Sequence, residues 1–410
     1  MTEHFLEQYR SFTANGASGA PAWLRSLREA AITRFADVGF PTTRQEQWRF
    51  TSVAPIAETP FMLVAAQWEI GGVPAGAEVL TLADALRRHP DLVRAHLARH
   101  AKPDANPFTA LATAFLADGV LVRVPPGVIV EQPIHLTWHR PPGGERPMTH
   151  PRLLVVLERE AQAKVVETYD AVPQGRGEFF TNAVTEIVVE DGARLDHCRV
   201  QRESEQGYHV AASQSHQGRD SRLVFTTIAL GGKLVRHELN AVLDGTGAYL
   251  ILNGLSVLGR SQHVDHHTTI EHAQPHCESH EYFNGVFDGE SRGVFNGRII
   301  VRPGAQRTDS KQTNNNLLLS AAARADSQPQ LEIYADDVKC THGSTVGPLD
   351  ETALFYLKSR GLGPDAARGL LTYGFGAEIL DRVAIPGVRE RLDSLVRARL
   401  GVPEASVSAA

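Results

Sequence analysis

The chain has 410 residues, of which 42% are apolar and 21% charged, a composition typical of a soluble globular protein with a large core. A formal net charge of −6 gives no overall attraction to nucleic acid or to an anionic membrane, so we expect neither as a partner. No apolar run approaches the ~20 residues that span a bilayer, the opening segment lacks a secretory signal, and three scattered cysteines favour a reducing cytoplasm.

Residues 1–117 are expected to be mostly helical, with short extended pieces. In "PAWLRSLREAAITRFADVGF", Leu24, Leu27, Ala31 and Phe35 recur at helical spacing, and the glycine and proline that follow predict the end of this helix. "TLADALRRHPDLVRAHLARH" predicts two short helices separated at its proline, and "NPFTALATAFL" predicts one more.

Residues 118–347 change to the pattern of β-strands. Short runs such as "RLLVVLE", "NAVTEIVVE" and "RLVFTTIAL" are rich in Val, Ile, Thr and Phe. Polar turn cues such as "EDGARLDHC" and "DGTGAYLIL" recur about every 24 to 31 residues, with one gap near twice that, as the coils of a solenoid would. We therefore expect a mainly β protein with a parallel β-helix core, and a β-sandwich or jelly roll is the alternative.

Residues 348–410 are expected to return to helices. "LDETALFYLKSRGL" has Asp350 as its N-cap, and "VRERLDSLVRARL" predicts the last helix. Between them runs an apolar stripe of Leu371, Phe375, Ile379 and Val383. Such a stripe either caps the solenoid or docks a partner, and the residues alone leave both readings open.

Residues 263–283, "HVDHHTTIEHAQPHCESHEYF", hold six histidines and one cysteine, the usual ligands of zinc and related metals. In a strand, alternate residues share a face, so one face holds His263, Asp265, His267, Thr269 and Glu271, and the other Val264, His266, Thr268, Ile270 and His272. Residues two apart lie roughly 6.6 Å apart and can share a metal, whereas residues four apart lie roughly 13 Å apart and cannot. We favour a polar strand face bonded to neighbouring coils, with a metal site in the stretch up to His280 as the alternative.

A longer motif is more specific. "PQLEIYADDVKCTHGSTVGPLDETALFYLKSRGL", residues 329–362, closely resembles the C-terminal signature of the SufB/SufD family, the scaffold proteins of iron–sulfur cluster assembly. "GFPTTRQEQWRFTSVAPI", residues 39–56, is similar to the N-terminal segment of this family, and "HHTTIEHAQPHCESHEYFNGV" is similar to its central core. The length of the chain and its few cysteines are closer to the SufD side of the family.

The resemblance implies a right-handed parallel β-helix between N-terminal and C-terminal helical regions. It implies a non-catalytic scaffold that pairs with SufB and recruits SufC, an ABC-type ATPase, through its C-terminal helices; a homodimer or a monomer in isolation stays open. Clusters then assemble at the SufB–SufD interface, where the motif places Cys340 and His342, with His342 as a candidate iron ligand. The cluster is transient and shared with SufB, and the isolated chain holds no tightly bound cofactor.

The chemistry of the two motif residues agrees with this expectation. Iron in a cluster accepts thiolate and imidazole ligands, but usually four protein ligands are needed, so one cysteine and one histidine must share the site with another chain. For recruitment of SufC we expect Leu354, Tyr356, Phe375 and Ile379 to contribute.

Other parts of the sequence bear on the alternatives. There is no G-x-x-x-x-G-K-[ST], so ATP hydrolysis would belong to a partner. Two alternatives remain: a SufB-type protein that holds the cluster itself, using Cys198 or Cys277, and a β-helix metalloenzyme using the His263–His280 cluster.

Overall fold

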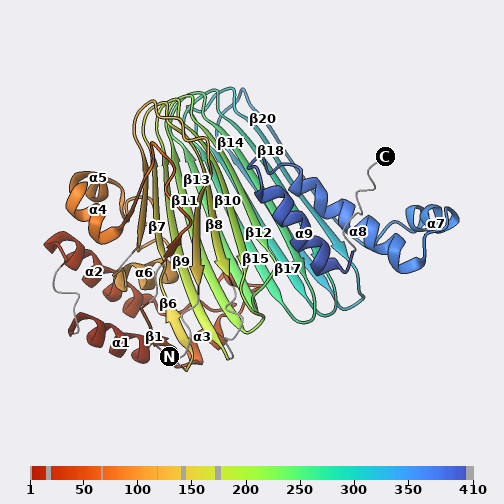
Figure 1. Cartoon of the computed structure of the whole chain (residues 1–410), viewed down its shortest axis with the longest axis horizontal. Coiled ribbons are helices and arrows are strands. Elements are labelled where there is room, and N and C mark those ends of the chain that lie inside the picture. Colours follow the sequence, from red (N-terminus) through yellow and green to blue (C-terminus); the bar gives the residue numbers. More distant parts are fainter. Residues whose placement is uncertain are drawn as a thin grey trace.

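The computed structural model describes residues 2–14, 20–65, 68–117, 119–139, 145–170 and 177–402. Figure 1 shows a long stack of parallel strands with one group of helices at its N-terminal end and another along its flank near the C-terminal end. The mainly β class and the parallel solenoid between helical regions are therefore confirmed.

The N-terminal region is mostly helical. Its helices are α1 (Glu3–Ala14), α2 (Ala22–Val38), a 3₁₀ turn (Glu46–Trp48), α3 (Ala54–Glu58), α4 (Leu82–Arg88), α5 (Pro90–His96) and α6 (Pro107–Ala114), and its strands are β1 (Met62–Leu63), β2 (Trp68–Ile70) and β3 (Glu78–Thr81). The expected apolar stripe of α2 is buried at Leu24, Ala31 and Phe35. Gly39 ends this helix with a φ of 63°, a conformation that glycine adopts without strain.

The solenoid consists of two sheets that receive one strand from each coil. An 11-stranded sheet contains β4 (Val120–Val124), β7 (Arg152–Leu157), β9 (Phe179–Val189), β11 (Gly207–Gln217), β13 (Leu234–Leu243), β15 (His263–His272), β17 (Arg292–Val301) and β19 (Arg324–Ile333), with β1, β3 and β6 (Pro147–Thr149) at its start. A 9-stranded sheet contains β2 and then β5 (Ile134–His139), β8 (Gln162–Asp170), β10 (Arg194–Arg202), β12 (Arg222–Ala229), β14 (Tyr249–Leu258), β16 (Glu278–Phe287), β18 (Asp309–Leu318) and β20 (Lys339–Gly347).

The register of the strands explains the repeat in the sequence. Tyr208 pairs with Leu234 and Leu234 with His263, so that one coil takes 26 and the next 29 residues. At the corner after most strands of the first sheet, one residue has a left-handed φ, as at Gly192, which is where the polar turn cues lie. A β-sandwich is ruled out because neighbouring coils pair in parallel in both sheets.

Alternate side chains of both sheets fill the inside of the solenoid, and helices cover the outer faces. The N-terminal helices pack on the outer face of the first sheet, where Phe180, Tyr208 and Leu234 join their core. On the outer face of the second sheet, Cys198, Leu255 and related residues pack against the C-terminal helices. Among the described residues, no helix is both long and apolar enough to cross a membrane.

The C-terminal helices are α7 (Glu351–Ser359), α8 (Pro364–Leu380) and α9 (Val388–Leu400). Asp350 caps α7 as expected, because its side chain accepts hydrogen bonds from the backbone of Thr352 and Ala353. The apolar stripe of α8 faces the solenoid: Ile379 is buried and Phe375 half-buried in one core with the second sheet. This corrects the expectation for Ile379, which attaches α8 to the flank of the solenoid and does not face a partner.

Candidate functional site

The two ends of the solenoid differ. At the N-terminal end, β3 and β2 pair antiparallel with β4 and β5 and so close both sheets. At the other end, β19 and β20 are the last strands of their sheets, and no described strand pairs with their outer edges. Unpaired strand edges bind further strands readily, so native proteins usually cover them. The final coil is therefore the part of this molecule most suited to pairing with another chain.

Cys340 and His342 lie on β20, on the face that points into the solenoid. Cys340 pairs with Ser310 and His342 with Gln312 on β18, and both of these β18 residues are buried inside the preceding coil. Because His342 belongs to the last coil, no strand of the described part of the chain stacks above it, and its side chain is exposed. Along a strand, such residues lie roughly 6.6 Å apart, close enough to contribute to one metal centre.

The surroundings of the thiol and the imidazole differ. Cys340 is half-buried against a small core around Ile299 and Ala305. Burial, together with the charge of Asp309, raises the pKa of Cys340, so the thiol stays protonated until a metal or cation stabilises the thiolate. Across the same coil, the hydroxyl of Ser344 donates to Ser327 at 2.9 Å and ties β20 to β19.

The histidine stretch divides between the two faces of β15 as predicted. The inward set, Val264, His266, Thr268, Ile270 and His272, is buried. His266 lies 3.1 Å from the hydroxyl of Ser256, and His272 2.8 Å from that of Ser279. Burial lowers the pKa of both imidazoles to about 4, so they are neutral and serve as hydrogen-bonding core residues. Among the described residues, no group of three or more His, Cys, Asp or Glu is arranged to hold a metal ion.

The outward face of β15 holds a contact that sequence reasoning missed. Asp265 accepts hydrogen bonds from Thr51 and from Arg236, both at 2.5 Å. The Arg236 guanidinium lies 3.7 Å from the centre of the Trp48 ring. Burial opposes the charge of Asp265, but Arg236 lowers the pKa of this carboxyl far below its usual range. The segment around Trp48 is therefore fastened to the solenoid by its contacts with the buried Arg236–Asp265 ion pair.

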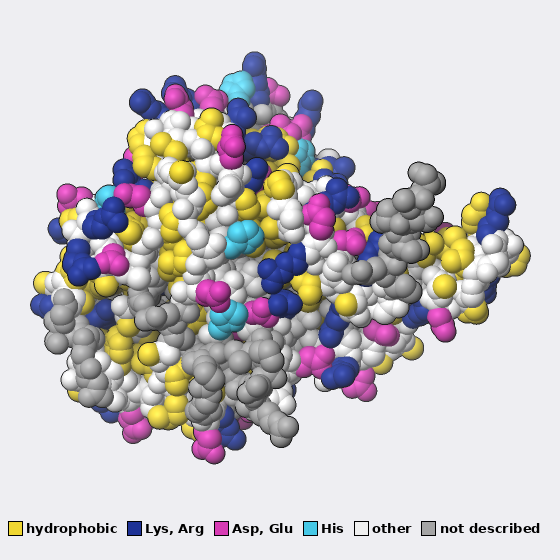
Figure 2. Space-filling model, viewed as in Figure 1, with side chains coloured by type: hydrophobic (Ala, Val, Ile, Leu, Met, Phe, Trp, Pro, Cys, Tyr) yellow, Lys and Arg dark blue, Asp and Glu magenta, His cyan; other side chains and the backbone are white. Residues whose placement is uncertain are grey.

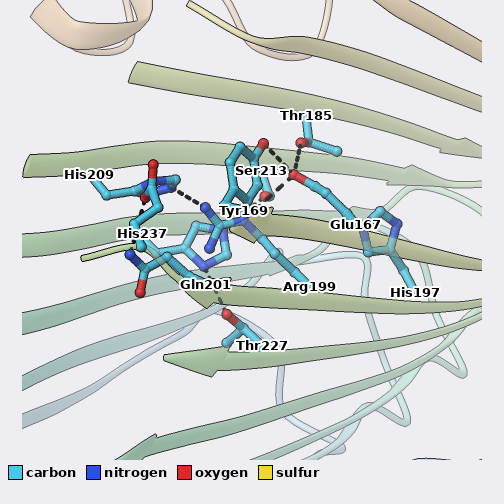
Figure 3. A network of polar contacts seen from close by, with 11 residues as sticks. Glu167, Tyr169, Thr185, His197, Arg199, Gln201, His209, Ser213, Thr227 and His237 are labelled. Carbon is cyan, nitrogen blue, oxygen red and sulfur yellow. Dashed lines mark hydrogen bonds and ion pairs between the residues drawn. The ribbon is translucent and has the colours of Figure 1, made fainter. Parts of the chain in front are cut away.

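A second missed feature is a polar network inside the middle coils (Figure 3). Glu167 accepts from Tyr169 at 2.6 Å and from Thr185 at 3.0 Å, and its other oxygen lies 2.8 Å from His197. Burial would raise the pKa of Glu167, yet the bond and charge of His197, with the charge of Arg199, lower it to about 2.

The network continues through Arg199, which donates to His209, while the other nitrogen of His209 lies 2.5 Å from Glu203. All of these side chains are buried and their charges are paired, so the network lies inside the coils and does not reach the surface. The sequence carried a signal for it: His197, Arg199 and Gln201 alternate along β10 and so share its inner face.

The two remaining cysteines are unsuited to accept sulfur as they are placed. Cys198 lies on the outer face of β10 beneath the C-terminal helices, and burial raises the pKa of its thiol to about 12. Cys277 is buried at a coil corner, where burial also raises the pKa of its thiol. Neither thiol forms a thiolate nucleophile readily in these positions.

Helix α7 presents the most exposed aromatic side chains of the C-terminal region. It projects from the body of the molecule and has no buried residue, and hydrophobic side chains lie open on it (Figure 2). Phe355 is 70% and Tyr356 55% exposed, whereas Leu354 is half-buried. An exposed apolar patch on a projecting helix is typical of a protein–protein contact.

Comparisons with known proteins agree over most of the chain. Residues 140–375 match the profile described as "SUF system FeS cluster assembly, SufBD core domain", and residues 1–72 and 62–136 match "SufBD protein N-terminal region". An iron–sulfur cluster assembly SufBD family protein of Synechocystis is 32% identical over 92% of this chain and 91% of its own. The iron–sulfur cluster assembly protein SufD of Escherichia coli is 30% identical over 96% of both chains, and that of Bacillus subtilis 27% over 93% and 94%.

Proposed function

The chain belongs to the SufBD family of SUF-system iron–sulfur cluster assembly proteins, and from this we propose that it is a SufD-type scaffold subunit. In this role it is not an enzyme: it pairs with a SufB-type chain and recruits a SufC-type ABC ATPase, which supplies ATP hydrolysis. We propose the cytoplasm as its compartment, without nucleic-acid or membrane partners, in agreement with the net charge and the few cysteines.

One observation supports the proposal most directly: the open final coil carries Cys340 and His342 on its uncovered inner face. The thiol and the imidazole provide two of the four protein ligands that clusters usually take. A partner strand that pairs with β20 or β19 would cover the open edge and bring the missing ligands. The nascent cluster, as cargo, would then lie between the two chains.

The apolar surface of the final coil supports pairing at this end. Three large hydrophobic residues of the last coil are exposed: Ile333 at the end of β19, Tyr334 directly after it, and Val346 on β20. A SufB-type partner would bury them together with the strand edges. The same edge would serve a homodimer when the chain is alone.

The test is anaerobic co-purification with SufB-type and SufC-type partners, followed by measurement of iron and sulfide per complex. We expect His342→Ala to leave the complex intact but to lower its iron and sulfide several-fold. Thr341→Ala is the matched control, because Thr341 is the neighbour of His342 on β20 but pairs with Lys311 on the outer face. A His342→Ala complex that assembles as much cluster as the Thr341→Ala complex would contradict the proposed role.

For the ATPase we propose the C-terminal region, within a three-part division of the chain at residues 1–117, 118–347 and 348–410. The exposed Phe355 and Tyr356 of α7 are the residues available for docking. Tyr356→Asp should abolish capture of the SufC-type partner in a pull-down, whereas Lys358→Ala, also exposed on α7, should not. Equal capture by both variants would place the docking surface elsewhere.

A further inference from the structure

His342 is the last member of a column of inward side chains. On the second sheet, Glu281 of β16 pairs with Gln312 of β18, and Gln312 pairs with His342 of β20. Adjacent strands of a sheet lie ~4.8 Å apart, so the three side chains are stacked along the inside of the last coils. Glu281 and Gln312 are 0% and 1% exposed, whereas His342 lies at the open end.

The amide of Gln312 is held in one orientation. Its nitrogen donates to a carboxyl oxygen of Glu281 at 2.5 Å. Gly297, across the solenoid, makes room for this amide, because a Cβ at that position would lie 2.2 Å from the nitrogen. The Gln312 carboxamide is thus held by Glu281 of the preceding coil and by the close approach of Gly297 across the solenoid.

The other end of this amide has no partner. The Gln312 carbonyl oxygen Oε1 is buried and accepts no hydrogen bond from the residues that the structure describes, which is unfavourable for a polar atom inside a protein. Since the nitrogen is turned toward Glu281 in the preceding coil, the oxygen is turned away from it. The next inward side chain in that direction is His342.

We propose that Gln312 is a positioning residue for His342: its carbonyl oxygen accepts the N–H of the imidazole when a partner covers the edge, which leaves the other ring nitrogen as the donor to iron. This inference rests on the proposed function, in which His342 binds iron at the interface. Histidines that bind metals almost always donate their second nitrogen to a carboxylate or carbonyl, which fixes the tautomer and the ring orientation. Glu281 acts indirectly, because it holds the Gln312 amide in its orientation.

The test measures Fe²⁺ affinity of the purified complex with its SufB-type partner, anaerobically and without sulfide, by competition with a chelator. Gln312→Leu should weaken Fe²⁺ binding about 10- to 100-fold, the usual effect of removing such a supporting group. Gln330→Leu is the matched control, because it makes the same change on β19 at a position that pairs with Arg298 and points outward. If Gln312→Leu does not assemble with the partner, Gln312→Met replaces it.

Two further variants separate positioning from a general structural effect. In a His342→Ala background, Gln312→Leu should cause no additional loss of Fe²⁺ affinity. The swap Glu281→Gln with Gln312→Glu keeps both the internal hydrogen bond and an acceptor oxygen, and should restore affinity to within a few-fold of the wild type.

The outcomes distinguish this inference from the proposed function. If His342→Ala itself leaves Fe²⁺ affinity unchanged, His342 is not a ligand. Both the proposed role of His342 and the positioning role of Gln312 are then contradicted. If His342→Ala weakens binding but Gln312→Leu does not, only the positioning role is overturned. An equal loss from Gln312→Leu with and without His342 also overturns it, because the effect would then not pass through the imidazole.

Discussion

Replacing Glu281 with glutamine should remove a pH-dependent destabilisation of the solenoid. The carboxyl is fully buried between coils, and burial raises its pKa from 4.5 to about 7 although the hydrogen bond from Gln312 opposes this shift. Glutamine has nearly the same shape, and its carbonyl oxygen can accept the hydrogen bond from the Gln312 amide nitrogen. The substitution therefore removes the titration and keeps the packing.

The sign and the size follow from the two pKa values. Below pH 4.5, the carboxyl is protonated in both the folded and the unfolded chain, so it contributes no pH dependence. Between pH 4.5 and about 7, the unfolded chain loses this proton while the folded chain keeps it, so the free energy of unfolding falls as pH rises. The full difference is on the order of 3 kcal/mol and is reached above pH 7.

The assay is urea unfolding of the wild type and Glu281→Gln, followed by far-ultraviolet circular dichroism from about pH 5 to about pH 8. The stability of the variant relative to the wild type should rise across this range by on the order of 3 kcal/mol. Glu278→Gln, a surface position on the same strand, controls for the loss of one carboxylate. Parallel pH profiles for the wild type and Glu281→Gln would refute the reasoning, because Glu281 would then ionise alike in both states.

Three further outcomes are expected. Asp265→Ala leaves the buried Arg236 without its main partner and should lower the free energy of unfolding by about 3–5 kcal/mol, measured by urea unfolding; a loss comparable to that of a surface substitution would contradict the role of this ion pair. Val346→Asp, at a 47% exposed position of the final coil, should abolish the pairing of this chain with another chain in analytical ultracentrifugation, without lowering the melting temperature. A dimer of unchanged stability would place the interface elsewhere. Titration with a disulfide reagent should modify Cys340 in the native chain and all three cysteines only after denaturation, and early reaction of a second thiol would show that the coils open.

The sequence predicted the elements well because their signals are local. Alternation separates the two faces of a strand, and in β15 the predicted face of Val264, His266, Thr268, Ile270 and His272 is the one that points inward and is buried. The caps at Asp350 and Gly39 depend on one residue each and lie where expected. The polar turn cues mark coil corners, so the repeat of the solenoid is present in the sequence itself.

Contacts between distant elements could not be predicted in this way. Asp265 lies on the outer face, where an isolated strand would expose it to water, yet the N-terminal segment around Trp48 covers it. Ile379 belongs to an amphipathic stripe, and periodicity cannot say whether such a stripe faces the same chain or another one. In both cases burial is decided by which element packs there, and no short window of sequence contains that information.

The column beneath His342 shows what a solenoid adds to local reasoning. Glu281, Gln312 and His342 are 31 and 30 residues apart, yet parallel stacking makes each the neighbour of the next. Thr341 is adjacent to His342 in the sequence, but its side chain points to the opposite face of β20. The chemistry at the open end should therefore respond to a buried residue one coil below and not to the next residue along the chain.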